Sequence, residues 1–177
     1  MGVNVQEMQQ KVDQFLSERG IVLTPHEMGK IEIAELGLDE YETTGLALLT
    51  YVNNDRYCAK ELVLLPKQTC PEHKHPPLSP SNPGKMETFR CRWGEVFLYV
   101  EGDPAHQPKA VVPESSKPYY TVFHEIVLRP GDQYDIPPNT FHWFQAGDQG
   151  AIITEFSSAC NDETDVFIDP RIIRIPK

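Results

Sequence analysis

The sequence lacks the cysteine spacing of a zinc finger or a redox motif. Its 177 residues contain only four cysteines, and no two of them form a CxxC pair. Without that spacing we expect neither a zinc knuckle nor a thiol–disulfide couple. We therefore predict reduced thiols that pack mostly in the interior. The four are Cys58, Cys70, Cys91 and Cys160.

Positive charge and long apolar runs are also scarce. Sixteen Lys and Arg residues stand against 26 Asp and Glu residues, which gives a formal net charge of −10 and a pI near 5.0. Nucleic acids and anionic membrane surfaces are polyanions, so we expect neither as a partner. No apolar run is long enough to cross a bilayer. The opening stretch MGVNVQEMQQ lacks the basic and apolar regions of a secretory signal, so we expect a cytoplasmic protein.

Residues 1–30 have the pattern of a short helical arm. Apolar residues recur there with helical spacing, which predicts an amphipathic helix over residues 4–19. The stretch TPHE at 24–27 combines an N-cap threonine, a proline in the first turn and a glutamate at the third helical position. It predicts a second helix, which must be short because a β-like alternation follows almost at once.

From residue 31 onward the sequence reads as strands. Eight or more short runs rich in β-branched and aromatic residues are separated by Gly, Pro, Asn and Asp. Two proline-rich segments, 76–85 and 103–120, are expected to be loops. The spacing indicates a sandwich or barrel rather than alternating helix and strand. We predict an all-β fold in one domain over residues 1–177, with a barrel over residues 31–177 after the helical arm.

The stretch TCPEHKHPP, residues 69–77, places two histidines one residue apart. On a strand, His73 and His75 project from the same face. Buried imidazoles need a polar partner, and the sequence offers Glu87 and His142 further along. Three nitrogens and one carboxylate can hold a divalent transition ion and leave coordination positions open. The alternative is a histidine pair on a surface turn, with Glu87 paired to a neighbouring arginine.

Two motifs in the chain resemble those of the cupin superfamily. HKH followed by Glu87, and seven residues later by Gly94, resembles the first cupin motif, and GDQYDIPPNTFH, ending at His142, resembles the second. The chain departs from the pattern by eleven residues between His75 and Glu87, a longer connection than is usual. A second departure is Asn139, where glycine is common, although asparagine tolerates the left-handed conformation well. The resemblance implies a jelly-roll barrel.

A closer resemblance covers roughly residues 20–173. The stretches DRYCAKELVLLPKQTCPEHKHPP, ETFRCRWGEVFLYVEG and YDIPPNTFHWFQAG are similar to those of D-lyxose isomerases within the cupin superfamily. That family usually uses Mn²⁺ and converts D-lyxose to D-xylulose and D-mannose to D-fructose. The ligand set by itself also accepts Co²⁺, Fe²⁺, Ni²⁺ or Zn²⁺. Because cupin relatives often pair through exposed sheet edges or N-terminal arms, we expect a homodimer.

Four further residues are candidates for the chemistry. Glu155 is an inward carboxylate with no evident basic partner in its strand, which suits a general base, the alternative being a salt bridge at a strand edge. The resemblance in CAKEL suggests that Lys60 holds a substrate hydroxyl or a developing oxyanion, although such a lysine is more often on the surface. Asp165 is a candidate proton shuttle or a turn cap. Arg171 is a candidate substrate-binding residue at the pocket mouth.

Together with these residues, the resemblance implies a metal-dependent aldose–ketose isomerase that acts on an unphosphorylated monosaccharide, and we expect proton transfer through a cis-enediol. A metal-assisted hydride shift is the alternative chemistry. A dioxygenase using Fe²⁺, an isomerase of phosphorylated sugars and a sugar-binding cupin without activity are the alternative functions. The polar candidates Lys60, Glu155 and Asp165 favour a polyol substrate, and the sequence shows no convincing phosphate cradle.

Overall fold

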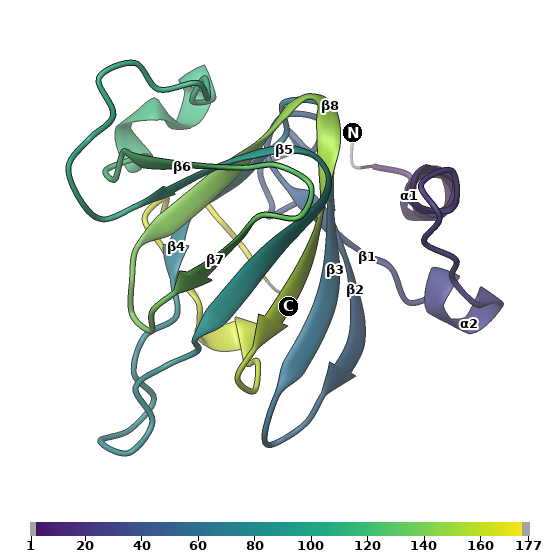
Figure 1. The fold of residues 1–177 in the computed structure, drawn as a ribbon, viewed down its shortest axis with the longest axis horizontal. Coiled ribbons are helices and arrows are strands. Elements are labelled where there is room, and N and C mark those ends of the chain that lie inside the picture. Colours follow the sequence, from purple (N-terminus) through teal and green to yellow (C-terminus); the bar gives the residue numbers. More distant parts are fainter. Residues whose placement is uncertain (1–2, 175–177) are drawn as a thin grey trace.

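The computed structural model describes residues 3–174, so the outermost residues of the predicted domain 1–177 lie outside the described range. One antiparallel sheet curls round on itself, and two helices lie beside it (Figure 1). This arrangement confirms the predicted all-β barrel with a helical N-terminal arm. That the chain forms one domain stays a prediction.

Each of the two helices begins at a residue whose side chain caps it, and for the second helix the sequence predicts this cap. Helix α1 (Val5–Ser17) starts after Asn4, whose side chain accepts a hydrogen bond from the backbone N–H of Glu7. Helix α2 (Pro25–Met28) follows Thr24, which forms a complete capping box with Glu27. Both predicted helices are confirmed, and each satisfies N–H groups that a helix start would otherwise leave unpaired.

Nine strands make up the sheet: β1 (Glu32–Ala34), β2 (Leu46–Asn53), β3 (Cys58–Leu64), β4 (Thr69–Lys74), β5 (Glu87–Val100), β6 (His124–Leu128), β7 (Gln133–Ile136), β8 (His142–Ser157) and β9 (Val166–Phe167). Two 3₁₀ helices, η1 (Glu114–Tyr119) and η2 (Asp162–Thr164), lie in the connections. The predicted loop over 103–120 therefore contains one short helix and, as expected, no strand.

The long strands β5 and β8 close the barrel. Strand β8 pairs with β3, β4 and β5, and β5 also pairs with β6 and β7. The pairing of β5 with β8 shifts register near Gly94, where the sheet bends. A Cβ atom on Gly94 would lie 2.1 Å from the carbonyl oxygen of Gly150, and its φ is +76°. Only glycine allows this close approach, so Gly94 fixes how the two strands cross.

Alternation along the strands divides the apolar residues between two sides of the sheet. Leu62 and Leu64 of β3 point into the barrel, whereas Val63 between them packs on the outer face with helix α1. Met8, Val12 and Leu16 of the helix are buried there. Burial of each such side chain stabilises the fold by about 1.5–3 kcal/mol. The arm is thus held to the barrel by a second apolar cluster.

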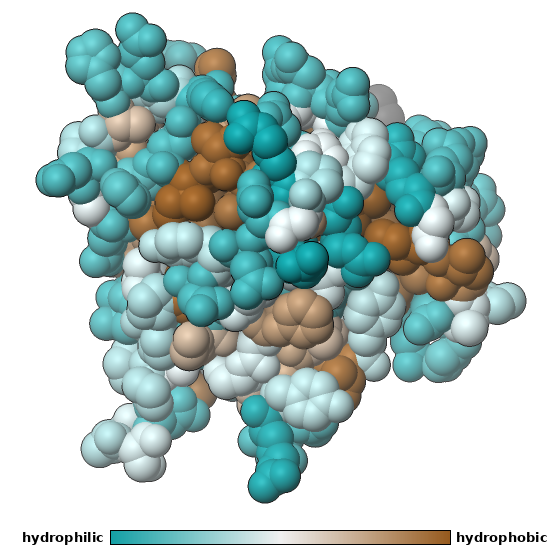
Figure 2. All heavy atoms as spheres, viewed as in Figure 1, coloured by the Kyte–Doolittle hydropathy of each residue, from teal (hydrophilic) through white to brown (hydrophobic). Residues whose placement is uncertain are grey.

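The face of the molecule drawn in Figure 1 is mainly polar. Figure 2 shows hydrophilic residues over most of the face drawn in Figure 1, with apolar side chains gathered in separate patches. Among residues 3–174, no helix is both long enough and apolar enough to span a membrane.

Candidate metal centre and active site

Three histidines meet inside the barrel. His73 lies in β4 directly opposite His142, the first residue of β8, and His75 follows two residues later on the same face. All three are buried, and one ring nitrogen of each lies within 4.8 Å of the others. The separations between ring centroids are 4.3 Å for His73–His142 and 5.1 Å for His73–His75. Alternate residues of an extended segment face the same side, so His73 and His75 both reach His142.

Each histidine uses its Nδ1 atom for a hydrogen bond away from the shared point. The Nδ1 atom of His73 lies 2.8 Å from the carbonyl oxygen of Pro71, and that of His142 lies 2.9 Å from the carbonyl oxygen of Thr140. The Nδ1 atom of His75 lies 2.5 Å from a carboxylate oxygen of Asp165. Acceptors at all three positions select the tautomer with a proton on Nδ1 and a lone pair on Nε2, the arrangement found around bound metals.

Glu87 adds an oxygen donor. Its carboxylate is buried and lies 3.1 Å from Nε2 of His75 and 3.3 Å from Nε2 of His142. Within the described part of the chain, three buried atoms at this point have no hydrogen-bond partner: Nε2 of His75, Nε2 of His142 and Oε2 of Glu87. Buried polar atoms without partners are costly. A divalent cation at this point would satisfy all of them, so the donor set fits such an ion.

Charges around the cluster have the sign that a cation site requires. Burial lowers the pKa of His75, but Glu87 and Asp165 outweigh this effect and raise the pKa to about 10. Burial together with the neighbouring His142 and His75 holds the pKa of His73 well below its ordinary value. Glu87 and Asp165 thus stabilise a positive charge at this point, which is a proton on His75 when no metal is bound and would be the metal ion itself when the Nε2 lone pairs bind one.

Asp165 lies beside the cluster rather than in the open pocket mouth. Its carboxylate accepts from Nδ1–H of His75, and its side chain is 7% exposed. A carboxylate in this position orients the imidazole and raises its basicity. The contact supports an orienting role for Asp165 better than the predicted proton shuttle.

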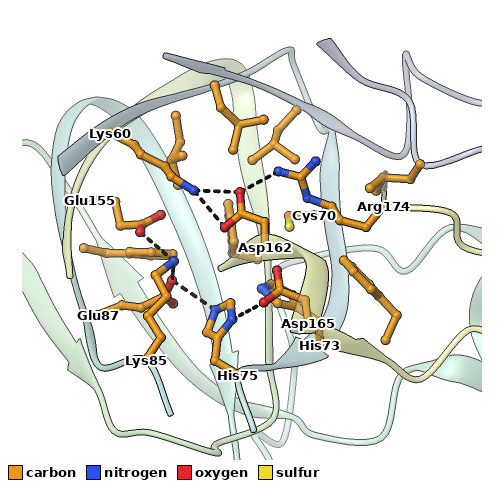
Figure 3. A pocket seen from close by; sticks show the side chains of 17 residues that line it. Lys60, Cys70, His73, His75, Lys85, Glu87, Glu155, Asp162, Asp165 and Arg174 are labelled. Carbon is orange, nitrogen blue, oxygen red and sulfur yellow. Dashed lines mark hydrogen bonds and ion pairs between the residues drawn. The ribbon is translucent and has the colours of Figure 1, made fainter. Parts of the chain in front are cut away.

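Lys60 and Glu155 face each other across the β3–β8 pair. They are register partners, both are buried, and both side chains point into the same pocket (Figure 3). The Nζ atom of Lys60 donates to the two carboxylate oxygens of Asp162 at 2.8 and 3.0 Å. Burial lowers the pKa of Lys60, but Glu155 and Asp162 outweigh it and raise that pKa above its ordinary value. Lys60 is therefore a buried cation, not a surface lysine.

Glu155 has a basic partner that comes from outside its own strand. Lys85 Nζ lies 2.7 Å from Oε1 of Glu155 and also forms an ion pair with Oε1 of Glu87. Burial lowers the pKa of Lys85, but the two glutamates raise it well above the ordinary value. The sequence indicated no basic partner within the strand itself, and Lys85 comes instead from the connection before β5.

Asp162 is held from two sides. Besides Lys60, it accepts from Nη2 of Arg174 at 2.8 Å, and Arg174 also pairs with Glu32 in β1. Burial raises the pKa of Asp162, but Lys60 and Arg174 lower it below the ordinary value. The C-terminal segment thereby reaches the pocket wall through Arg174 (Figure 3).

Arg171 does not line the pocket. Its guanidinium donates to Asp169 at 2.6 Å and to Ser116 at 2.9 Å, and its side chain is 44% exposed. The chain turns between positions 171 and 174, so Arg174 reaches the site that the sequence assigned to Arg171. Arg174, and not Arg171, lines this pocket, and substrate binding by Arg171 stays a prediction.

Apolar side chains form the rest of the pocket wall. They come from the β1–β2 region, β3, the closing strands β5 and β8, and the segment before the C-terminus. They are Leu36, Leu46, Leu48, Leu62, Phe89, Phe144 and Phe167. A cavity with one charged side and one apolar side can bind a polyol by its hydroxyl edge and pack its carbon face.

Sequence analysis missed Lys85, Asp162 and Arg174. Lys85 stands two residues before Glu87, and that same-face spacing was a usable signal. Asp162 and Arg174 lie in irregular segments without periodicity, so no pattern could place them in the pocket.

These features define a cupin-type barrel with a candidate His₃–Glu metal centre beside buried acids and bases. The family model described as D-lyxose isomerase matches residues 5–177. The chain therefore belongs to the D-lyxose isomerase family, and it is an enzyme that interconverts aldoses and ketoses.

Curated relatives agree with this assignment. The chain is 58% identical to the D-lyxose ketol-isomerase of Cohnella laeviribosi, over 99% of this chain and 96% of that one. It is 60% identical to the D-lyxose/D-mannose isomerase of Thermosediminibacter oceani, over 98% and 95%. Among solved structures, an L-ribose isomerase of Cellulomonas parahominis with L-psicose aligns with a TM-score of 0.78. That alignment covers 93% of this chain and 91% of the other at 15% identity, so it supports the fold alone.

Proposed function

We propose that this enzyme converts D-lyxose to D-xylulose, and D-mannose to D-fructose, by proton transfer through a cis-enediol in the presence of a divalent metal ion. The observation that carries the proposal is that the register partners Lys60 and Glu155 line the same pocket as His73, His75 and Glu87 of the His₃–Glu cluster. The names of the relatives support the choice of sugars.

His73, His75, His142 and Glu87 are the proposed ligands, and Mn²⁺ is the proposed metal. Their donor atoms converge and fit a transition ion. When bound, such an ion supplies Lewis acidity that polarises a carbonyl and makes the adjacent C–H more acidic. Asp165 would hold the ring of His75 in the ligating orientation.

Glu155 is the proposed base. One of its carboxylate oxygens takes the proton from C2 of the aldose while O1 takes a proton from the Lys60 ammonium group, which gives the enediol. The same carboxylate oxygen then returns its proton to C1, and Lys60 recovers a proton from the hydroxyl on C2, which leaves the ketone. Both carbons present this proton on one face in a cis-enediol path, so a single carboxylate serves both half-reactions. Lys85, 2.7 Å from Oε1, holds the carboxylate in position.

Lys60 is the proposed donor to the sugar oxygens. Its ammonium group donates a hydrogen bond to the oxygen at C1 or C2 where negative charge develops, which lowers the barrier. Asp162 and Glu155 keep Lys60 protonated. Arg174, through Asp162, fixes the position of this ammonium group.

A sugar panel tests the proposal. Protein stripped of metal and reloaded with Mn²⁺ is incubated with D-lyxose, D-mannose, L-ribose and mannose 6-phosphate, and ketose formation is measured. We expect D-xylulose from D-lyxose, D-fructose from D-mannose, and no turnover of the phosphorylated sugar. Oxygen consumption without ketose would identify a dioxygenase, and sugar binding without ketose would identify a binding protein. Either result would overturn the proposal.

The predicted homodimer stays a prediction. The sheet leaves strands with open edges, and several large apolar residues are exposed, including Tyr51, Tyr57 and Phe156. Light scattering coupled to size-exclusion chromatography would test it, since a mass equal to one chain would contradict it.

A further inference from the structure

Two cysteines that are far apart in the sequence meet at the edge of the pocket. Cys58 is the first residue of β3 and lies opposite Ser157, the last residue of β8. Cys160 follows β8, and its Sγ atom lies 3.3 Å from Oγ of the same Ser157, so both cysteines are neighbours of this serine. They belong to no CxxC motif, so the sequence indicated no thiol pair.

The backbone around Cys160 is held in place by one side chain. The amide of Asn53 donates to the carbonyl oxygen of Cys160 at 3.0 Å and accepts from its N–H at 3.1 Å. Asn53 is itself the register partner of Cys58 in the β2–β3 pair. This double hydrogen bond keeps the segment that carries Cys160 against the strand that carries Cys58.

The two thiols differ in access and acidity. Cys58 is 1% exposed, whereas Cys160 is partly exposed. The neighbouring thiol of Cys58, with the nearby ammonium groups of Lys85 and Lys60, lowers the pKa of Cys160 to about 7. The neighbouring thiol of Cys160, together with burial, raises the pKa of Cys58. Cys160 is therefore the nucleophilic thiol of the pair and Cys58 the one that resolves it.

We propose that Cys58 and Cys160 form an oxidisable dithiol that closes to an intrachain disulfide beside the active site. With hydrogen peroxide as oxidant, the Cys160 thiolate attacks one peroxide oxygen, the O–O bond breaks, and the departing hydroxide takes a proton to become water. The sulfur of Cys58 then attacks the resulting sulfenic acid, loses its proton and releases a second water. Two electrons pass from sulfur to oxygen, so two thiols and one peroxide give one disulfide and two waters.

The location connects this disulfide to turnover. The Sγ atom of Cys160 lies 3.8 Å from Oε1 of Glu155, and Asp162, the partner of Lys60, is two residues further along. Closing the disulfide draws Cys160 toward Cys58 and displaces the segment that carries Asp162. Displacement of a catalytic group by about 1 Å lowers rates by about 100-fold. We expect oxidation to reduce kcat by about 10- to 100-fold, a consequence that rests on the proposed function.

The experiment treats the Mn²⁺-loaded protein with a small excess of hydrogen peroxide. We expect loss of two of the four free thiols, a fall in mass of about 2 Da, and a peptide that links Cys58 to Cys160. Dithiothreitol should restore both the thiols and the activity. The variant Cys160→Ser should keep its remaining thiols and its activity under the same treatment. Cys91→Ser is the matched control, because Cys91 is buried away from the pair, and it should still form the linkage.

Three results would overturn the proposal. They are a disulfide between other cysteines, oxidation of Cys160 without a cross-link, and equal inactivation of the wild type and of Cys160→Ser. A cross-linked protein that keeps full activity would overturn the link to turnover. The mass measurement needs no substrate, so a reduced protein that forms the linkage but isomerises no sugar would refute the proposed function alone.

Discussion

Replacement of Glu155 by glutamine tests the proposed base. Glutamine has nearly the same shape as glutamate, but its amide cannot accept the C2 proton. Glu155 is 4% exposed and its pocket is formed by fixed strands, so the variant keeps the volume and packing of the site. The substitution therefore removes one chemical property and little else.

The expected loss of rate is large. A positioned general base contributes about 10²–10⁴-fold, so kcat of Glu155→Gln should fall by that factor. The cost in stability is smaller. Breaking a buried ion pair costs about 3–5 kcal/mol when a charge is left alone. Lys85 keeps its pairing with Glu87 after the change, so we expect a loss below about 3 kcal/mol.

Glu61→Gln is the matched control. Glu61 is the neighbour of Lys60, is 2% exposed, and accepts from Thr154 and Tyr51 on the outer face of the same strand pair. It does not line the pocket. The control also neutralises a buried carboxylate, so it should change stability without changing kcat by more than about twofold.

The assay measures ketose formation, bound metal and thermal unfolding for both variants. We expect Glu155→Gln to keep its metal and its fold while kcat falls by about 10²–10⁴-fold. Turnover by Glu155→Gln near the wild-type rate would refute the assignment of the base. An equal loss in Glu61→Gln would show that charge removal, rather than lost proton transfer, is responsible.

Three further predictions follow from the site and the fold. Chelation should abolish turnover, and one equivalent of Mn²⁺ per chain should restore it. The variant His142→Asn should fail to retain the ion in metal analysis. Full activity without metal would contradict the proposed metal site. The variant Asp162→Asn should move the alkaline limit of kcat/KM to lower pH, because the Asp162 carboxylate helps to raise the pKa of Lys60 and keep it protonated. An unchanged alkaline limit in a folded variant would exclude this effect of Asp162 on Lys60. The variant Gly94→Ala should have a free energy of unfolding lower by about 3 kcal/mol or more in chemical denaturation, because its Cβ would meet the carbonyl oxygen of Gly150. A loss below about 1 kcal/mol would contradict the close approach of β5 and β8 at Gly94.

The fold could be predicted from the sequence because the features that determine its helices, strands and turns depend on residues close together in the chain. The capping box of Thr24 and Glu27 fixes the start of α2, and the alternation in β3 separates barrel-facing leucines from Val63. Asn139 adopts φ +58°, so the turn before β8 forms without the usual glycine. Each feature depends on neighbours in the chain and needs no knowledge of distant contacts.

The cluster of His73, His75 and His142 could be predicted for the same reason, since alternation along a strand puts the first two on one face and a second motif supplies the third ring. The ion pairs of the pocket could not be predicted from the sequence. Lys85 and Asp162 reach the pocket from irregular segments whose path depends on tertiary packing. For Lys60, the sequence left a surface position open as an alternative to the pocket. The alternation of side chains along a strand does not reveal which carboxylates lie across the pocket.

The most direct test of the account follows the proton. Mn²⁺-loaded enzyme converts D-lyxose in D₂O, and the ketose formed early in the reaction is analysed by NMR and mass spectrometry. Transfer through the Glu155 carboxylate predicts D-xylulose that carries deuterium at C1, because the carboxyl proton exchanges with solvent before some of the returns. D-xylulose formed without any deuterium at C1 would contradict proton transfer by Glu155 and indicate a hydride shift.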